Sequence, residues 1–114
     1  MISRLHRFHG YGSLGFAYRK GSTVRGPLFA LRYVSNSRIP RYRAAVVVSR
    51  KVHKSAVVRN RIRRRLYALI REELPPTTPP HDLIFTVFSD KVAEAKSTEL
   101  RQTLVSLLQK AGLR

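Results

Sequence analysis

Five arginines fall within seven consecutive positions, 59 to 65, in the stretch AVVRNRIRRRL. A guanidinium group holds its N–H donors in a fixed plane, which lets it bind phosphate through two hydrogen bonds or stack on a base. Valine, isoleucine and leucine stand between the arginines, and a disordered basic tail would not need them. The stretch therefore predicts a folded helix that presents a positive face to a polyanion.

The other ionisable residues offer little basis for catalysis. The four histidines lack metal-ligand spacing, and we interpret them as surface residues of a basic protein. All six carboxylates lie from Glu72 onward, where helix capping, the helix dipole and solvent exposure explain them. The chain has no cysteine, and no glycine-rich phosphate loop follows a predicted strand. We therefore predict no catalytic residue, no metal site and no cofactor bound by the protein itself.

The distribution of charge indicates the same kind of partner. The 114-residue chain has a formal net charge of +17, and its first 71 residues contain no Asp or Glu. A solvated surface usually mixes both signs of charge, so a long stretch without acid indicates a phosphate-binding face. The chain is 43% hydrophobic, enough for one core, and no segment approaches the ~20 apolar residues that span a bilayer. We expect one domain over residues 1–114, cytoplasmic and without a membrane partner.

Apolar periodicity and turn residues predict the elements that position the arginines. Helices are expected at residues 13–21, about 55–74 and about 97–111, and strands at residues 28–34, 46–48 and 82–88. Ser55 and Ser97 are expected to cap the second and third helices, and the PPTTPP run ends the second. A short polar loop containing Pro40 joins the first two strands, which we expect to form an antiparallel pair. This order predicts one α/β domain, a small sheet with helices packed on it.

The second predicted helix is amphipathic at 100° per residue. Its apolar side is expected to hold Val58, Ile62, Leu66, Leu69 and Ile70, and its opposite side Asn60, Arg63, Arg64, Tyr67 and Arg71. Arg65 projects into the apolar side, and Arg59 lies near the other edge of that side. Their stems can lie along the core while the charged groups reach solvent.

Aromatic residues are interleaved with the basic ones. Stacking an unpaired base on an aromatic ring contributes about 1–3 kcal/mol to binding. Strand alternation places Tyr33 on the same side as Leu31, and core packing is the alternative role for Phe16 and Phe29. The sequence leaves open which rings face a nucleic acid.

The segment SRKVHKSAVVRNRIRRRLYALIRE resembles the protein component of bacterial ribonuclease P. That family has a strand ending in a Ser-Lys-Lys-like segment, followed by a helix with an Arg-Asn-Arg core. Here these are Ser49, Arg50 and Lys51, followed by Arg59, Asn60 and Arg61. The segments KGSTVRGPLFALRYVSN, DLIFTVF and STELRQTLVSLLQKAGL extend the resemblance over roughly residues 14–113.

The resemblance implies an α+β two-layer sandwich with a four-stranded mixed sheet and a left-handed βαβ crossover that positions the basic helix. It also implies a function, the protein subunit of ribonuclease P. In that family a catalytic RNA, which requires Mg²⁺, removes the 5′ leader of precursor tRNA. The protein binds this RNA and holds the single-stranded leader in a cleft along the sheet. We expect a monomeric protein in a 1:1 ribonucleoprotein.

The resemblance assigns two groups of site residues. The residues expected to bind the catalytic RNA are Arg50, Lys51, Lys54, Arg59, Asn60, Arg61, Arg63, Arg64 and Arg65, and those expected to bind the leader are Phe16, Tyr18, Arg32, Tyr33, Ser49 and Tyr67. The family tends to place two aromatics four residues apart on its first helix, where this chain has Leu14 and Tyr18. A second cleft aromatic corresponds to Tyr33 or is replaced by Arg32.

Two other functions are compatible with a small basic domain. A structural ribosomal protein is the main alternative, although such proteins often carry long basic extensions without a core. A module for double-stranded DNA needs a helix with varied base-reading residues, and this helix offers only Asn60 among its arginines.

Overall fold

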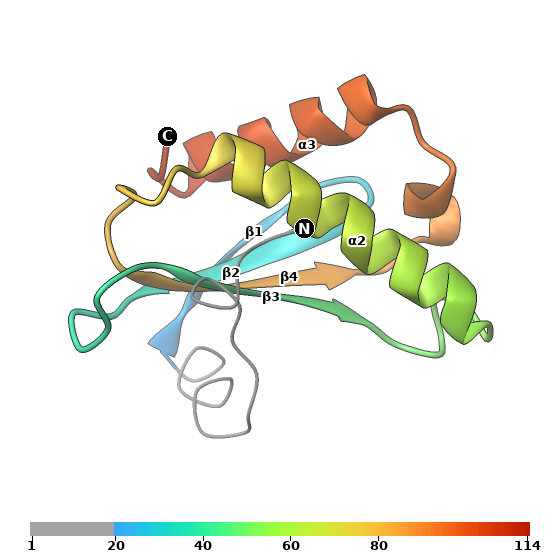
Figure 1. The fold of residues 1–114 in the computed structure, drawn as a ribbon, viewed down its shortest axis with the longest axis horizontal. Helices are drawn as coiled ribbons and strands as arrows, with labels where there is room; N and C mark the ends of the chain where they lie inside the picture. The colour runs from blue at the N-terminus through green and yellow to red at the C-terminus, as the bar shows by residue number, and fades with distance from the viewer. Residues whose placement is uncertain (1–19) are drawn as a thin grey trace.

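The computed structural model describes residues 20–114, whose strands form one four-stranded sheet in the order β1–β2–β4–β3 (Figure 1). The strands are β1 (Ser22–Arg25), β2 (Phe29–Ser35), β3 (Arg43–Val48) and β4 (His81–Val87), and the helices are α2 (Ala56–Glu73), the short 3₁₀ helix η2 (Asp90–Ala93) and α3 (Ser97–Lys110). Strand β4 runs antiparallel to β2 and parallel to β3. Both α-helices lie on one face of the sheet, which confirms the predicted α+β architecture.

The expectation that β2 and β3 pair with each other is wrong. Strand β4 lies between them, although it comes last in the sequence. Leu83, Ile84 and Phe85 in β4 have no exposed surface. Such a strand is apolar on both faces, and a central position buries both.

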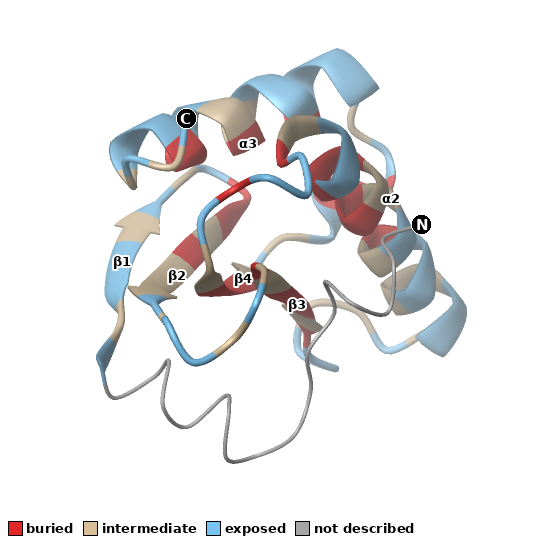
Figure 2. Cartoon of the chain, turned by 60° about the vertical axis from the view of Figure 1, so that its left-hand side comes forward, coloured by how far each residue is buried: buried red, intermediate tan, exposed pale blue. Residues whose placement is uncertain are grey.

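Strands β3 and β4 are joined through α2, and this parallel crossover is left-handed, as the resemblance implies (Figures 1 and 2). The helix begins close to the end of β3, after a loop of seven residues, 49–55. The predicted cap is confirmed, since the Ser55 side chain accepts a hydrogen bond from the Val58 N–H. In α3 the N-cap position is Lys96 instead of Ser97, and Gly112 follows the helix with a φ of 75°.

The core lies between the sheet and the two helices (Figure 2). Alternate strand residues, among them Leu31 and Phe85, point toward the helices and pack with Ile62, Leu66 and Leu104. We call this side of the sheet the helix face. The remaining strand residues form the second face, where Ala45 and Ile84 are buried with Val34 and Val47 partly buried beside them.

Two contacts tie the helices and the sheet together at the far end of α2. Arg101 of α3 donates to Glu73 at 2.8 Å and to Glu72 at 2.7 Å. The hydroxyl of Tyr42, just before β3, donates to the carbonyl of Leu74 at 3.0 Å. The end of α2 is thereby fixed against both layers.

Candidate nucleic-acid interface

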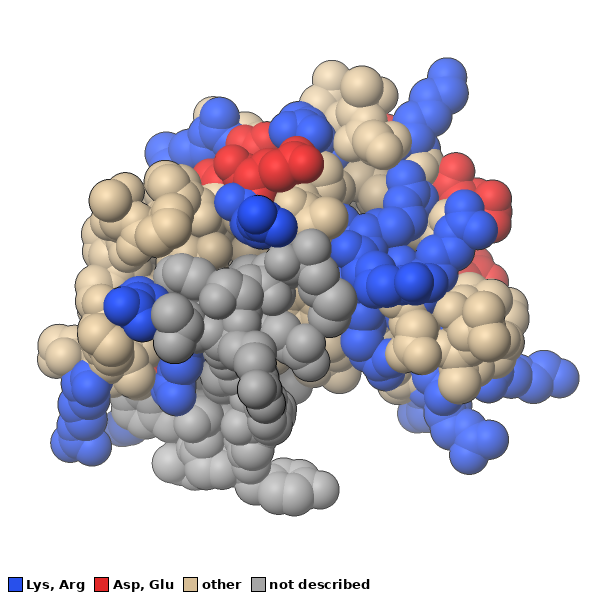
Figure 3. Space-filling model, viewed as in Figure 1, with Lys and Arg blue, Asp and Glu red and all other residues tan. Residues whose placement is uncertain are grey.

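Basic side chains gather over the first half of α2 and the loop before it (Figure 3). We define the basic surface as six exposed residues, Arg50, Lys51, Lys54, Asn60, Arg61 and Arg64. Among residues 20–114, no carboxylate forms an ion pair with any of its cations. The surface therefore presents unneutralised charge on a rigid helix, the arrangement that binds phosphate.

Arg63 lies between the basic surface and the sheet. Its Nη1 donates to Asn60 Oδ1 at 2.7 Å, and its Nη2 reaches the carbonyl of Val48 at 3.4 Å. Because the Asn60 oxygen accepts this bond, the NH₂ group of this exposed side chain remains as a hydrogen-bond donor. The Arg-Asn pair thus joins the basic surface to the end of β3.

Two of the residues predicted to contact RNA, Arg59 and Arg65, donate hydrogen bonds to the protein's own backbone. Arg65 donates to the carbonyls of Val92 at 2.6 Å and Ala95 at 2.5 Å. Arg59 donates to the carbonyls of His53 at 3.0 Å and Lys54 at 2.8 Å. Both side chains are half-buried, as expected from their positions beside the apolar stripe. Arg65 holds the segment before α3, and Arg59 holds the loop that carries part of the basic surface.

The prediction of a polar, leader-facing position for Tyr67 is wrong. Its side chain is 6% exposed and packs in the core. Its hydroxyl accepts a hydrogen bond from the Val46 N–H at 3.0 Å. Since β3 is an edge strand, this N–H has no partner strand, and the phenol supplies the acceptor that a buried N–H requires. The buried arc of α2 is wider than the apolar stripe because the helix also covers the edge of β3.

Of the residues expected to bind the leader, those within residues 20–114 do not share one site. Tyr33 packs with Leu31 on the helix face, as strand alternation predicts, whereas Arg32 lies on the second face and donates to Thr23 at 2.7 Å. Ser49 is exposed at the end of β3. Phe16 and Tyr18, with nearly all of the helix predicted at 13–21, lie outside the described residues.

Asp82 differs from its predicted solvent-facing role. The residue is fully buried, and its carboxylate accepts hydrogen bonds from Arg43 at 3.0 and 3.2 Å and from Asn36 at 2.9 Å. Both carboxylate oxygens have hydrogen-bond partners, so Asp82 links β4 to β3 and to the loop after β2. It is not placed for acid–base chemistry.

The contact between Arg25 and Phe88 was not predicted from the sequence. The guanidinium carbon of Arg25 lies 4.9 Å from the centroid of the Phe88 ring. Phe88 is 40% exposed although it follows directly on a buried strand. An aromatic residue just past the end of an apolar run was the available signal.

The described residues lack two other kinds of feature. No group of three or more His, Cys, Asp or Glu side chains among residues 20–114 could hold a metal ion. Within the same range, no helix has the length and apolar character needed to cross a membrane.

The model of the family described as Ribonuclease P matches residues 3–112. The chain belongs to the ribonuclease P protein family. The ribonuclease P protein component of Synechococcus elongatus is 33% identical over 115 residues, which cover 98% of this chain and 94% of that protein. The component from Thermus aquaticus is 40% identical over 95 residues, 83% of this chain and 54% of that protein.

The structure of the Staphylococcus aureus RNase P protein has the same fold, with a TM-score of 0.81 over 95% of this chain and 96% of that one. The two sequences are 21% identical, so this likeness bears on the fold alone. Together, the matches make the chain the protein subunit of ribonuclease P, a tRNA-processing complex. The ribosomal-protein alternative receives no support from them.

Proposed function

We propose that the basic surface binds the catalytic RNA of ribonuclease P, and that the chain thereby assists the RNA-catalysed endonucleolytic removal of the 5′ leader from precursor tRNA. One observation carries the proposal. The cations of the basic surface project from a helix and its preceding loop, and no carboxylate among the described residues neutralises them. The RNA would supply the catalytic centre and its Mg²⁺, and the protein would supply phosphate contacts.

The fixed geometry of the surface favours structured RNA over a nonspecific polyanion. Arg59 anchors the loop that carries Lys54, and Arg63 orients the Asn60 amide. Donors held in place before binding lose little conformational freedom when a phosphate arrives. The expected complex contains one protein and one RNA and functions in the cytoplasm.

We assign the leader to the second face of the sheet. Arg32 lies there, and Ser49 lies at its end next to the basic surface. Tyr33 faces the helices, which favours the alternative that Arg32 takes the place of the strand aromatic. Tyr18 and Phe16 keep their assignment to the leader from the family resemblance alone.

The test is cleavage of precursor tRNA by a bacterial-type catalytic RNA at low Mg²⁺, with and without the protein. Strong stimulation is expected, and only when a 5′ leader of several nucleotides is present. The double variant Arg61→Gln/Arg64→Gln should bind the RNA at least tenfold more weakly, about 1.4 kcal/mol. Arg38→Gln is the control for a general loss of positive charge, because it removes one charge from an exposed loop at the opposite end of the sheet, and it should leave the affinity nearly unchanged.

Unchanged RNA affinity in the double variant would contradict the assignment of the basic surface. Tight RNA binding without any stimulation of cleavage would contradict the function and favour a ribosomal RNA partner.

A further inference from the structure

Phe88 is one of two large apolar side chains that are exposed in the described part of the chain, the other being Val57 of α2. An arginine lies over its ring, with the guanidinium carbon of Arg25 4.9 Å from the ring centroid. This spacing is that of a cation–π contact. The pair thus presents an aromatic surface and a positive charge side by side.

The pair lies on the second face, at the end of the sheet where the chain enters the basic surface. Phe88 continues the alternation of Ile84 and Thr86, and Arg25 pairs in register with Ala30, which pairs with Thr86. The Phe88 N–H donates to the carbonyl of Leu28 at 3.1 Å, so the strand pairing extends to this residue.

Strand register also brings the pair close to the basic loop. Val48, the last residue of β3, is in register with Val87, the last residue of β4. Ser49 and Phe88 follow this pair on neighbouring strands, which lie about 5 Å apart. Arg50 and Lys51 come next along the chain. A strand of RNA leaving the basic loop therefore meets Phe88 first and Arg25 after it.

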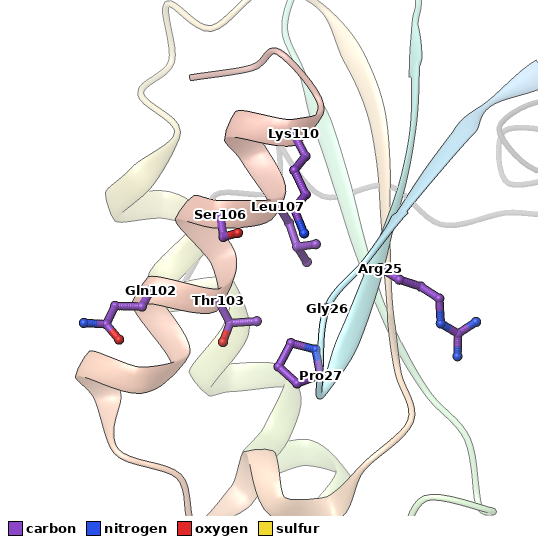
Figure 4. Close-up of a pocket in the computed structure, with 8 residues that line it drawn as sticks. All are labelled: Arg25, Gly26, Pro27, Gln102, Thr103, Ser106, Leu107 and Lys110. Atoms are coloured by element: carbon purple, nitrogen blue, oxygen red, sulfur yellow. The ribbon is translucent and has the colours of Figure 1, made fainter.

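Arg25 is not engaged by α3. A groove of about 370 Å³ lies between the β1–β2 turn and α3, and Arg25 stands at its rim. Its side chain points away from Gln102, Ser106 and Lys110, which come from the helix side of the groove (Figure 4). No carboxylate among residues 20–114 forms an ion pair with it. The guanidinium is therefore directed to Phe88 and to solvent.

We propose that the Arg25–Phe88 pair is a stacking site for an unpaired base of the precursor tRNA leader. This inference rests on the proposed function and extends the leader's path across the strand ends, from β3 toward β1. A ring and a guanidinium plane both stack on bases of any sequence, and the charge also attracts the adjoining phosphate. Contact of this type is selective for single-stranded over helical RNA, because bases in a helix are already stacked.

The first experiment compares Phe88→Leu with Phe88→Tyr in the complex of catalytic RNA and protein. Binding of precursor tRNA with a leader of several nucleotides should weaken about tenfold in the leucine variant, a typical value for one lost stacking contact. The tyrosine variant keeps the ring and should bind as the wild type does. Mature tRNA should bind equally well to all three proteins.

The second experiment uses the absence of tryptophan from the chain. Phe88→Trp introduces a single indole at the site, and a base stacked on it should quench its fluorescence. Precursor tRNA should quench the signal in the assembled complex, and mature tRNA should leave it unchanged. Arg25→Gln in the same background should reduce the affinity measured by this quenching.

Two outcomes would overturn the stacking site. One is equal binding of precursor tRNA by wild type and Phe88→Leu, and the other is an indole signal that precursor and mature tRNA quench alike. In either case the wild-type protein would still stimulate cleavage, so the proposed function would stand. Failure of the wild-type protein to stimulate cleavage would instead contradict the proposed function, and with it the assignment of the leader as the ligand of this site.

Discussion

The arginines on the solvent-facing side of α2 differ from those on its flanks in what their guanidinium groups contact. Arg61 and Arg64 are exposed, and no hydrogen bond or ion pair joins the guanidinium group of either one to another described residue. Arg59 and Arg65 are half-buried, and each donates to two backbone carbonyls. A rotation of 100° per residue separates Arg64 from Arg65. Neighbouring arginines thus serve different purposes, one set available to a partner and the other fixing the loops around it.

The largest expected effect is on stability, from Arg65→Met. Methionine keeps an unbranched apolar stem, but the carbonyls of Val92 and Ala95 lose their charged donors. We expect the free energy of unfolding to fall by roughly 3 kcal/mol, measured by urea denaturation. RNA affinity, measured where the variant is fully folded, should stay within about twofold of wild type. A large loss of affinity in the folded variant would break the comparison, because it would make Arg65 an RNA contact.

High pH should weaken the contact between Tyr42 and the end of α2 while the arginines of the helix stay charged. Burial raises the pKa of Tyr42 to about 12 from its ordinary value of 10.0. Below pH 10 this tyrosine is neutral whether the chain is folded or unfolded, so its stabilising contribution is complete there. Between pH 10 and pH 12 only the unfolded chain ionises it, and about 2–3 kcal/mol of stability should be lost. Guanidinium groups remain charged throughout this window.

The check is the free energy of unfolding at pH 9 and at pH 12 for wild type and Tyr42→Phe. The phenylalanine variant should be less stable at pH 9, because it lacks the hydrogen bond to Leu74, and its stability should fall less as the pH rises. An equal fall in the free energy of unfolding between pH 9 and pH 12 for the two proteins would show that folding does not raise the pKa of Tyr42.

The third prediction concerns Tyr67, which was expected to face the leader. Tyr67→Phe keeps the buried ring but leaves the Val46 N–H without its acceptor. We expect a loss of about 1–2 kcal/mol in unfolding free energy and no change in the preference for precursor over mature tRNA. A selective loss for precursor tRNA at unchanged stability would return Tyr67 to the leader site.

Much of this arrangement could be predicted from the sequence because it depends on local pattern. The apolar period placed Ile62, Leu66 and Ile70 in the core, and Ser55 marked the start of α2. Strand alternation assigned Tyr33 to the side of Leu31. These features follow from the geometry of one element at a time.

The features that were mispredicted, and those that were not predicted at all, depend on long-range contacts. Tyr67 is buried because the helix overlaps the edge of β3, and no local pattern reports that overlap. The carbonyls that Arg65 binds lie more than 25 positions away in the sequence. The order of strands was wrong for the same reason, since β4 separates two strands that are neighbours in the chain. The Arg25–Phe88 contact likewise joins residues far apart in sequence.

The smallest effect is also the most discriminating, and it comes from Arg64→Gln. The side chain is exposed, so unfolding free energy should change by less than about 0.5 kcal/mol. RNA affinity should fall about fivefold at low salt, the cost of one phosphate contact. The slope of log affinity against log salt concentration should become shallower by roughly 0.7 to 0.9, because one fewer counterion is released.

Arg65→Met should leave that slope unchanged. If both variants reduce the slope equally, the division of the α2 arginines into an RNA-binding set and a fold-stabilising set is wrong, and the charge of the helix acts as a whole.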